Sequence, residues 1–141
     1  MFYEIKGVQD VVTVQEIKTA KKLSDLRSKV FLETRGYLRQ SLSTLFDLNP
    51  LEIPINAHPG EPPILPPSMG NISLSHCKDA LVIVWHKRKI GIDIERTDRD
   101  FNHKKFAEKY FFRTNKSTLK KLTKNMILNQ WCAVEAAIKW D

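Results

Sequence analysis

The chain has 141 residues, 42% of them apolar and 28% charged, which is the composition of one water-soluble globular domain and excludes intrinsic disorder. Its longest apolar run, residues 80–85, is too short to cross a bilayer, and its N-terminus lacks the pattern of a secretory signal. We therefore expect a cytoplasmic protein with no membrane partner. The net charge of +7 indicates attraction to nucleic acid, lipid, a phosphorylated ligand or an acidic protein.

A long amphipathic helix is predicted between Lys21 and Phe46, where apolar residues recur at steps of three and four. Gly36 is a position where this helix can be interrupted. The pair Asn49-Pro50 disfavours helix and ends it. The prolines that crowd residues 50–67 predict a loop, with at most a short edge strand at 51–55.

Beyond residue 70 the apolar period changes to two, which predicts β-strands. The three candidate strands are an alternating segment at 72–75, the apolar run at 80–85 and a second alternating segment at 90–95. The short polar stretch 86–89 predicts a tight hairpin between the last two. Helical patterns follow at 101–112, 117–122 and 126–140.

The segment 90–95 carries two neighbouring carboxylates. In a strand its isoleucines point into the core, while Gly91, Asp93 and Glu95 share the other face. Such carboxylates repel each other unless a cation or proton lies between them, and hard oxygen ligands favour magnesium, manganese or calcium over zinc. Gly91 is expected to leave room for a bulky ligand. The alternative is an ordinary solvated strand face.

The last predicted helix adds a second pair, Glu135 and Lys139, at positions i and i+4. Alone, such a pair is most often a surface ion pair. Three alanines keep the helix slim, however, so Glu135 could join Asp93 and Glu95 as the third carboxylate of a magnesium site. The stripe expected to be buried consists of Ile127, Trp131, Val134 and Ile138.

Three basic residues are candidate phosphate ligands. His76, at the end of a predicted strand, is either a phosphate contact or a turn residue that caps its own backbone. Arg35 and Arg39 project from one side of the long helix, where they could clasp phosphate oxygens or simply form a solvated polar face. Cys77 and Cys132 are too few for a disulfide framework and lack zinc-site spacing, so both are expected to be reduced, packed thiols.

Three segments in this order resemble motifs of the 4′-phosphopantetheinyl transferase family: Asn71-Ile-Ser-Leu-Ser-His76, Ile90-Gly-Ile-Asp-Ile-Glu95, and Trp131-Cys-Ala-Val-Glu-Ala-Ala-Ile-Lys139. Each motif alone is weak, but the ordered set is specific. Residues 31–39 and Gly60-Glu-Pro62 are similar to the longer, Sfp-like branch. The resemblance covers roughly residues 27–140.

The resemblance implies an α+β fold, with a small antiparallel sheet packed by a long helix. It further implies an N-terminal half at 1–88 and a partial second half at 89–141, because long-branch members continue well beyond the position of Lys139. The edge of an unfinished second sheet would be a route to homo-oligomers. By the same resemblance, Asp93, Glu95 and Glu135 bind Mg²⁺, and Glu135 and Lys139 are catalytic. Coenzyme A would be bound by Arg35, Arg39, Ser75, His76 and Lys139.

The implied reaction transfers phosphopantetheine from coenzyme A to a serine of an acidic acyl or peptidyl carrier protein and releases 3′,5′-ADP. The positive surface would steer the encounter with the carrier. One alternative is a degenerate family member that binds coenzyme A or a carrier protein without transferring anything. A nucleic-acid-binding protein is a third hypothesis that rests on charge alone, and we do not expect a nucleic-acid partner.

Overall fold

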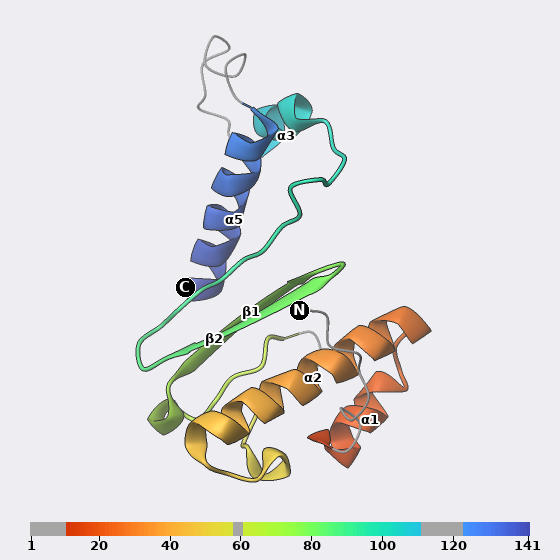
Figure 1. Ribbon diagram of the computed structural model, residues 1–141, viewed down its shortest axis with the longest axis vertical. Helices are drawn as coiled ribbons and strands as arrows, with labels where there is room; N and C mark the ends of the chain where they lie inside the picture. Colours follow the sequence, from red (N-terminus) through yellow and green to blue (C-terminus); the bar gives the residue numbers. More distant parts are fainter. Residues whose placement is uncertain (1–10, 58–60, 111–122) are drawn as a thin grey trace. The chain divides into compact units, whose positions relative to one another are not determined.

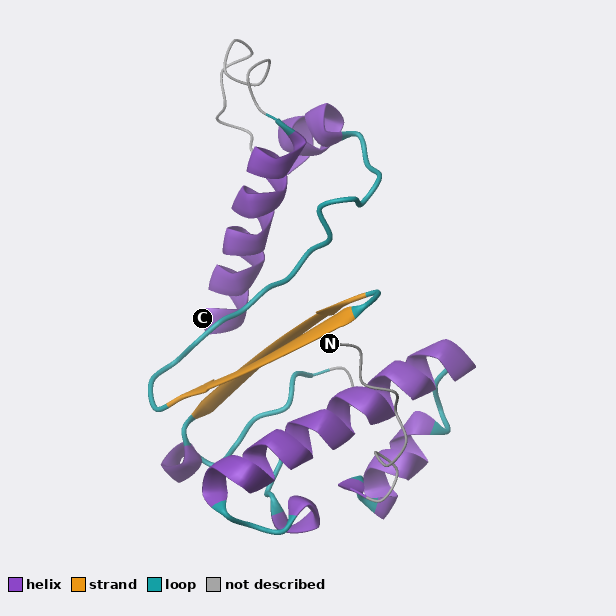
Figure 2. Cartoon of the chain, viewed as in Figure 1, coloured by secondary structure: helices purple, strands orange, loops and turns teal. Residues whose placement is uncertain are grey.

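The computed structural model describes residues 11–57, 61–110 and 123–141 (Figure 1). Within these ranges the chain forms four α-helices and one two-stranded antiparallel sheet, connected by loops and short 3₁₀ turns (Figure 2). The mixed α+β class predicted from the sequence is therefore confirmed. None of the described helices is both long and apolar enough to span a membrane.

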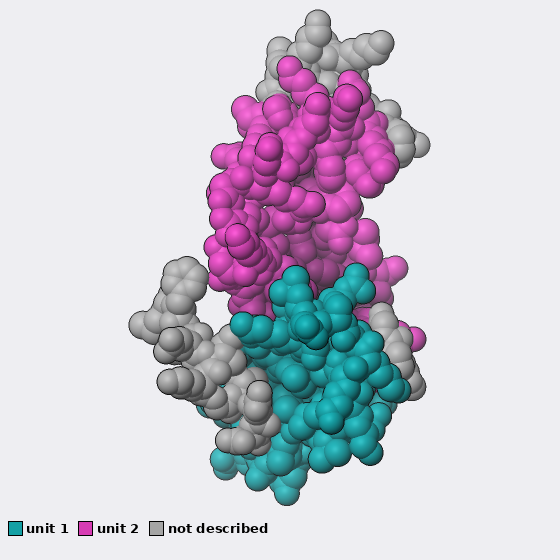
Figure 3. Space-filling model, turned by 90° about the vertical axis from the view of Figure 1, so that its right-hand side faces the viewer, with its two compact units in different colours: residues 1–56 teal, residues 57–141 magenta. Residues whose placement is uncertain are grey.

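The chain divides into two compact units, residues 1–56 and residues 57–141 (Figure 3). Each unit has buried apolar side chains of its own. In the first they include Leu38, Leu42 and Ile53, and in the second Ala107, Ile127 and Leu128. The halves predicted at 1–88 and 89–141 are the two copies of an internal repeat. Compact units do not test for a repeat, so these halves stay a prediction.

The first unit begins with helix α1, Val14–Ala20, which the sequence analysis did not predict. A capping box starts it, because Thr13 Oγ1 accepts from the Glu16 amide at 3.2 Å and Glu16 Oε2 accepts from the Thr13 amide at 2.8 Å. Helix α2, Asp25–Phe46, follows and runs without interruption through Gly36. The predicted long helix is thus confirmed over these residues, but its expected start at Lys21 is wrong because that residue caps the end of α1.

Helix α2 ends at Asp47, which adopts the left-handed conformation with φ 54°. The chain then makes a short 3₁₀ turn, Pro50–Glu52, where the Asn49 side chain accepts from the Leu51 amide at 2.9 Å. The edge strand considered at 51–55 is therefore absent. Proline at the first position of the turn suits a 3₁₀ helix, since its missing N–H has no partner there to lose.

The second unit is built on a β-hairpin. Strand β1, Asn71–Cys77, pairs antiparallel with strand β2, Ala80–His86, in the register Asn71↔His86 to Cys77↔Ala80. Both strands were predicted. Gly70 precedes β1 with φ 86°, and a Cβ there would lie 2.8 Å from the His86 carbonyl oxygen, so the turn needs glycine.

Residues 90–95, predicted as a third strand, do not join the sheet and form an extended loop instead. Figure 2 shows them within the long loop between β2 and the next helix. The tight hairpin predicted at 86–89 is consequently wrong, and the hairpin turn is formed by Lys78 and Asp79. Alternating polarity identified the extended backbone correctly, but it cannot show whether a neighbouring strand is there to accept its hydrogen bonds.

Two helices complete the second unit. Helix α3, His103–Tyr110, falls inside the predicted segment 101–112, and helix α5, Lys124–Trp140, matches the segment predicted at 126–140. The helix predicted at 117–122 lies outside the described residues. The helices meet through aromatic rings, with the Trp131 ring centroid 4.8 Å from that of Phe106 and 5.0 Å from that of Tyr110.

The buried stripe predicted on α5 is wrong in its second half. Ile127 is buried, but Val134 is 39% and Ile138 is 65% exposed. Beyond the first residue of α5, the buried and half-buried positions are instead Ile127, Leu128, Trp131, Cys132, Glu135 and Ala136. The physical reason is that the extended loop packs on this face of α5 and brings polar groups against Cys132 and Lys139.

Candidate functional site

Polar contacts from strand β1 and helix α5 meet at Asp93 in the second unit. Its Oδ1 accepts a hydrogen bond from Ser75 Oγ at 2.8 Å and a charged one from Lys139 Nζ at 2.7 Å. The Asp93 side chain is 9% exposed and that of Lys139 is 31% exposed. One carboxylate oxygen thus joins residues of strand β1 and helix α5.

Serine hydroxyls hold the extended loop alongside β1. Ser73 and Ser75 are two positions apart, so both lie on one face of the strand, and both are buried. Ser73 Oγ accepts from the Ile92 amide at 3.1 Å, and Ser75 Oγ accepts from the Ile94 amide at 3.3 Å. Ser75 therefore accepts from the backbone on one side of Asp93 and donates to its carboxylate, which fixes that side chain against the strand.

Gly91 sets the approach of helix α5. A Cβ at this position would lie 1.9 Å from the Ala136 carbonyl oxygen and 2.8 Å from the Trp140 amide nitrogen. The expectation that Gly91 leaves room for a ligand is therefore wrong, because the backbone of α5 fills that space. The close approach also explains the small residue Ala136 on this helix, and it brings Lys139 within reach of Asp93.

The extended loop is also fixed near both ends. Lys89 Nζ donates to the Asp141 carbonyl oxygen at 2.6 Å, at the C-terminal end of α5. Arg96 pairs with Asp79 in the hairpin turn at 2.6 Å and also with Asp98. Because these ion pairs are exposed, they add little stability, but they define the path of the loop past the site.

Opposing effects act on the pKa of Asp93. Burial raises it, and hydrogen bonds from Lys139 and Ser75 with the charge of Lys139 lower it, leaving a net pKa below the ordinary value. The nearby Cys132 thiol shows the opposite result. Burial and the negative charge of Asp93 raise the pKa of Cys132, so it stays a neutral thiol beside the carboxylate.

The three carboxylates predicted as metal ligands are not assembled into one site. Glu95 pairs with Arg99 at 2.5 Å, and Glu135 is half-buried on α5 one turn before Lys139. Across the described ranges, no three His, Cys, Asp or Glu side chains form a group that could hold a metal ion. The positive charge next to Asp93 is the ammonium of Lys139, which forms an ion pair with this carboxylate.

His76 lies apart from this cluster. Side chains alternate along a strand, so His76 is on the face of β1 opposite to Ser75, and it is exposed. It stays a predicted phosphate contact that the structure does not bring to Asp93.

The two candidate arginines lie buried in the first unit. Arg39 Nε donates to Glu16 Oε2 at 2.8 Å, and its NH1 donates to the carbonyl oxygens of Pro50 and Ile53 at 2.9 and 3.0 Å. The guanidinium of Arg39 is thus engaged within the protein. Arg35 is 7% exposed, and no described group forms a hydrogen bond with its buried NH1.

Sequence reasoning missed Ser73, Cys132 and Arg99 as parts of this cluster. Ser73 had a usable signal, because it repeats the position of Ser75 two residues earlier on the same strand face. Cys132 and Arg99 had none, since their contacts with residues 93–95 depend on how α5 and the loop pack.

The chain matches no protein-family model, and a search of curated proteins finds no significant match either. Any function assigned to this chain therefore rests on its motifs and on the contacts around Asp93.

Proposed function

We propose that this protein transfers the 4′-phosphopantetheine group of coenzyme A to a serine of an acyl or peptidyl carrier protein. The observation that carries the proposal is the meeting of Ser75, Asp93 and Lys139 through 2.7 and 2.8 Å hydrogen bonds. Each comes from a different one of the three motifs that resemble the transferase family. A shared contact among the three motifs is what the proposal requires if they serve one site.

The proposed reaction is an in-line displacement at phosphorus. The carrier serine oxygen attacks the phosphorus that bears pantetheine, its O–P bond forms, and the P–O bond to 3′,5′-ADP breaks. Glu135 is the proposed base that takes the serine proton. Lys139 is the proposed donor to a pyrophosphate oxygen, where its charge would stabilise the developing negative charge.

Magnesium is the proposed cofactor. The donor types suit the ion, because Asp93, Glu95 and Glu135 would supply hard oxygen ligands, but Asp93 and Glu95 would first have to leave Lys139 and Arg99. When bound, the ion would neutralise charge on the pyrophosphate.

Arg35 supports phosphate binding in the first unit. Its guanidinium lies over the Phe31 ring at 5.1 Å, and its buried NH1 has no described hydrogen-bond partner. A buried donor without a partner is costly, and a phosphate oxygen would satisfy it. Arg35, more than Arg39, is therefore the proposed phosphate contact within the first unit, and its guanidinium would have to turn outward to meet a ligand.

The test is the intact mass of a panel of apo carrier proteins after incubation with this protein, coenzyme A and magnesium, with an EDTA control. A mass gain of one phosphopantetheine that EDTA prevents supports the proposal. Absence of any gain, with coenzyme A binding retained, would favour the degenerate binding protein, for which the pairing of Asp93 and Glu95 with internal cations is the motivating observation.

Asp93→Ala should lower the transfer rate by about 100-fold or more, because it removes both a proposed metal ligand and the partner of Lys139. Asp100→Ala, an exposed change on the same loop, is the matched control and should transfer at the wild-type rate. Equal rates for the two variants would remove Asp93 from the site.

A further inference from the structure

The corner between helices α1 and α2 combines exposed leucines with cations that have no described ion-pair partner. Every residue from 21 to 27 is exposed, and Leu26, at 74%, is the most exposed of the large apolar residues that the structure describes. The α1–α2 corner consists of Lys18, Lys21, Lys22, Leu23, Leu26 and Arg27. We propose that this corner binds the surface of an anionic lipid bilayer.

Backbone hydrogen bonds hold the corner in place, so that its side chains project from an ordered turn. The Lys21 amide donates to the Ile17 carbonyl oxygen at 3.1 Å at the end of α1. The Ser28 amide donates to the Ser24 carbonyl oxygen at 2.8 Å at the start of α2. Lys18 lies one turn before Lys21, so both side chains project from one side of α1. A partner therefore meets a surface that is already formed.

The four cations of the corner are not neutralised within the protein. None of them forms an ion pair with a residue in the described ranges, whereas Lys29, just beyond them, lies 3.8 Å from Glu33. Asp25 is the one carboxylate between residues 18 and 27, and it lies in the first turn of α2, where the helix dipole partly offsets its charge. The corner therefore has a net positive charge, which complements the anionic headgroups of phosphatidylserine.

The residue types of the corner favour a bilayer over a protein or a nucleic acid as its partner. Lysine is depleted in protein–protein interfaces, and the aromatic residues that anchor such interfaces are absent from the corner. Exposed leucines gain nothing from the phosphates of a nucleic acid. At a bilayer, in contrast, lysine keeps its ammonium among the headgroups while its stem and the neighbouring leucines enter the apolar boundary.

The other exposed leucines of the first unit provide an internal contrast. Leu45, Leu48 and Leu51 lie in the stretch 40–57, which contains no lysine or arginine. Within the described part of this unit, exposed leucines therefore adjoin unpaired cations in the sequence only at the corner. Binding at the bilayer surface needs no membrane-spanning helix, and it replaces the expectation that the protein has no membrane partner.

The experiment is co-flotation of the whole protein with lipid vesicles, without coenzyme A or a carrier protein. One set of vesicles is phosphatidylcholine alone, and the other contains about 30% phosphatidylserine. The protein should float only with the anionic vesicles, and added salt should weaken its binding. Soluble glycerophosphoserine should not compete, because a free headgroup offers no apolar boundary to Leu26. No group is transferred in this assay, so its result is independent of the proposed function.

A matched pair of charge variants locates the contact. Lys21→Gln combined with Lys22→Gln should weaken binding to the anionic vesicles by about 25-fold, at about fivefold for each cation near the surface. Lys104→Gln combined with Lys105→Gln, the same loss of charge at exposed positions of α3, should weaken it by less than about threefold. Equal losses in the two double variants would show attraction by net charge alone and would overturn the proposal.

A matched pair of leucine variants tests the apolar contact. Leu26→Gln should weaken vesicle binding by at least about threefold, whereas Leu51→Gln, at a position 49% exposed in the same unit, should bind like the wild type. Circular dichroism confirms that each variant is folded. Absence of flotation with anionic vesicles would sink the proposal. Binding to apo acyl carrier protein that Leu26→Gln weakens, with no binding to vesicles, would also reject it and make the partner of the corner an acidic protein.

Discussion

Glu16 and Arg39 form an ion pair with side chains only 12% and 5% exposed, between α1 and α2. Burial raises the pKa of Glu16, but hydrogen bonds from Arg39 and Thr13 outweigh it and leave the pKa below its ordinary value. A carboxylate with a lowered pKa in the folded protein stabilises that state above its unfolded-state pKa. The contribution is lost as the pH falls through the folded-state pKa.

Glu16→Gln should therefore lower the free energy of unfolding by about 3 kcal/mol at pH 7, because it leaves Arg39 buried without its counter-charge. The difference from the wild type should shrink as the pH falls from about 5 to about 2. Urea unfolding across this range measures it. Glu52→Gln, an exposed change in the same unit, is the matched control, and parallel curves for both variants would contradict the argument.

At the scale of elements, the contact between the extended loop and α5 depends on the absence of one side chain. Gly91→Ala would place a methyl carbon 1.9 Å from the Ala136 carbonyl oxygen, so the helix must move away. We expect a loss of about 3 kcal/mol in the free energy of unfolding, measured in urea. Ala137→Leu, on the exposed side of α5, should change it by less than about 0.5 kcal/mol.

The elements show what sequence reasoning can and cannot reach. Helix α2 and the two strands were predicted because their apolar periods are long and regular. Helix α1 was missed although Thr13-Val-Gln-Glu16 is a capping-box signature. The rotation of α5 could not be predicted, because Val134 and Ile138 look like a core stripe until the packing of residues 91–95 is known.

The candidate site, like the helices and strands, could be predicted only in part from the sequence. Residue type and motif order lead to Ser75, Asp93 and Lys139 as candidate site residues, and the structure brings these three into contact. That Lys139 would pair with Asp93, and not with Glu135 on its own helix, depends on a long-range distance that no local pattern contains.

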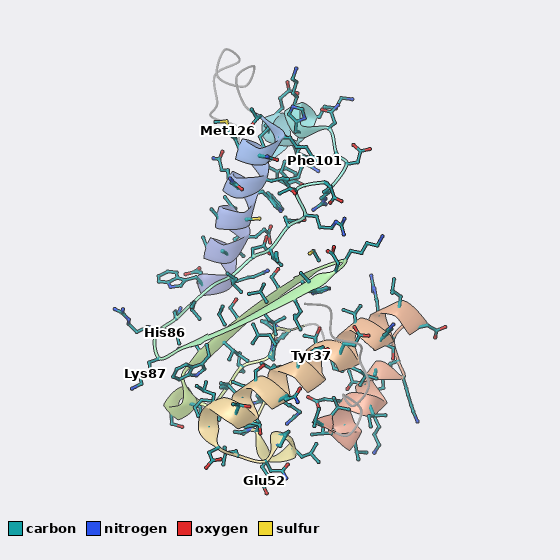
Figure 4. The ribbon with its side chains drawn as sticks, viewed as in Figure 1. Tyr37, Glu52, His86, Lys87, Phe101 and Met126 are labelled. Atoms are coloured by element: carbon teal, nitrogen blue, oxygen red, sulfur yellow. The ribbon has the colours of Figure 1, made fainter. Side chains whose placement is uncertain are left out.

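At the scale of the whole molecule, the net charge of +7 should speed encounters with the acidic carrier protein that we propose as partner. In the second unit, His86 and Lys87 are exposed near the C-terminal end of α5, while Phe101 and Met126 lie toward the other end (Figure 4). Salt screens such exposed charges, so the association rate with an acidic carrier should fall about tenfold between low and high ionic strength. Stopped-flow fluorescence measures this rate, and a rate independent of salt would exclude electrostatic steering.

The attachment of the extended loop through two serine hydroxyls has a consequence for exchange of its amide protons with deuterium. The amides of Ile92 and Ile94 are bonded to side chains and not to a neighbouring strand. They can therefore be released by rotation of Ser73 and Ser75 while every backbone bond between β1 and β2 stays closed. Hydrogen exchange should therefore be faster at Ile92 and Ile94 than at the amides paired between β1 and β2, even in a molecule that stays folded.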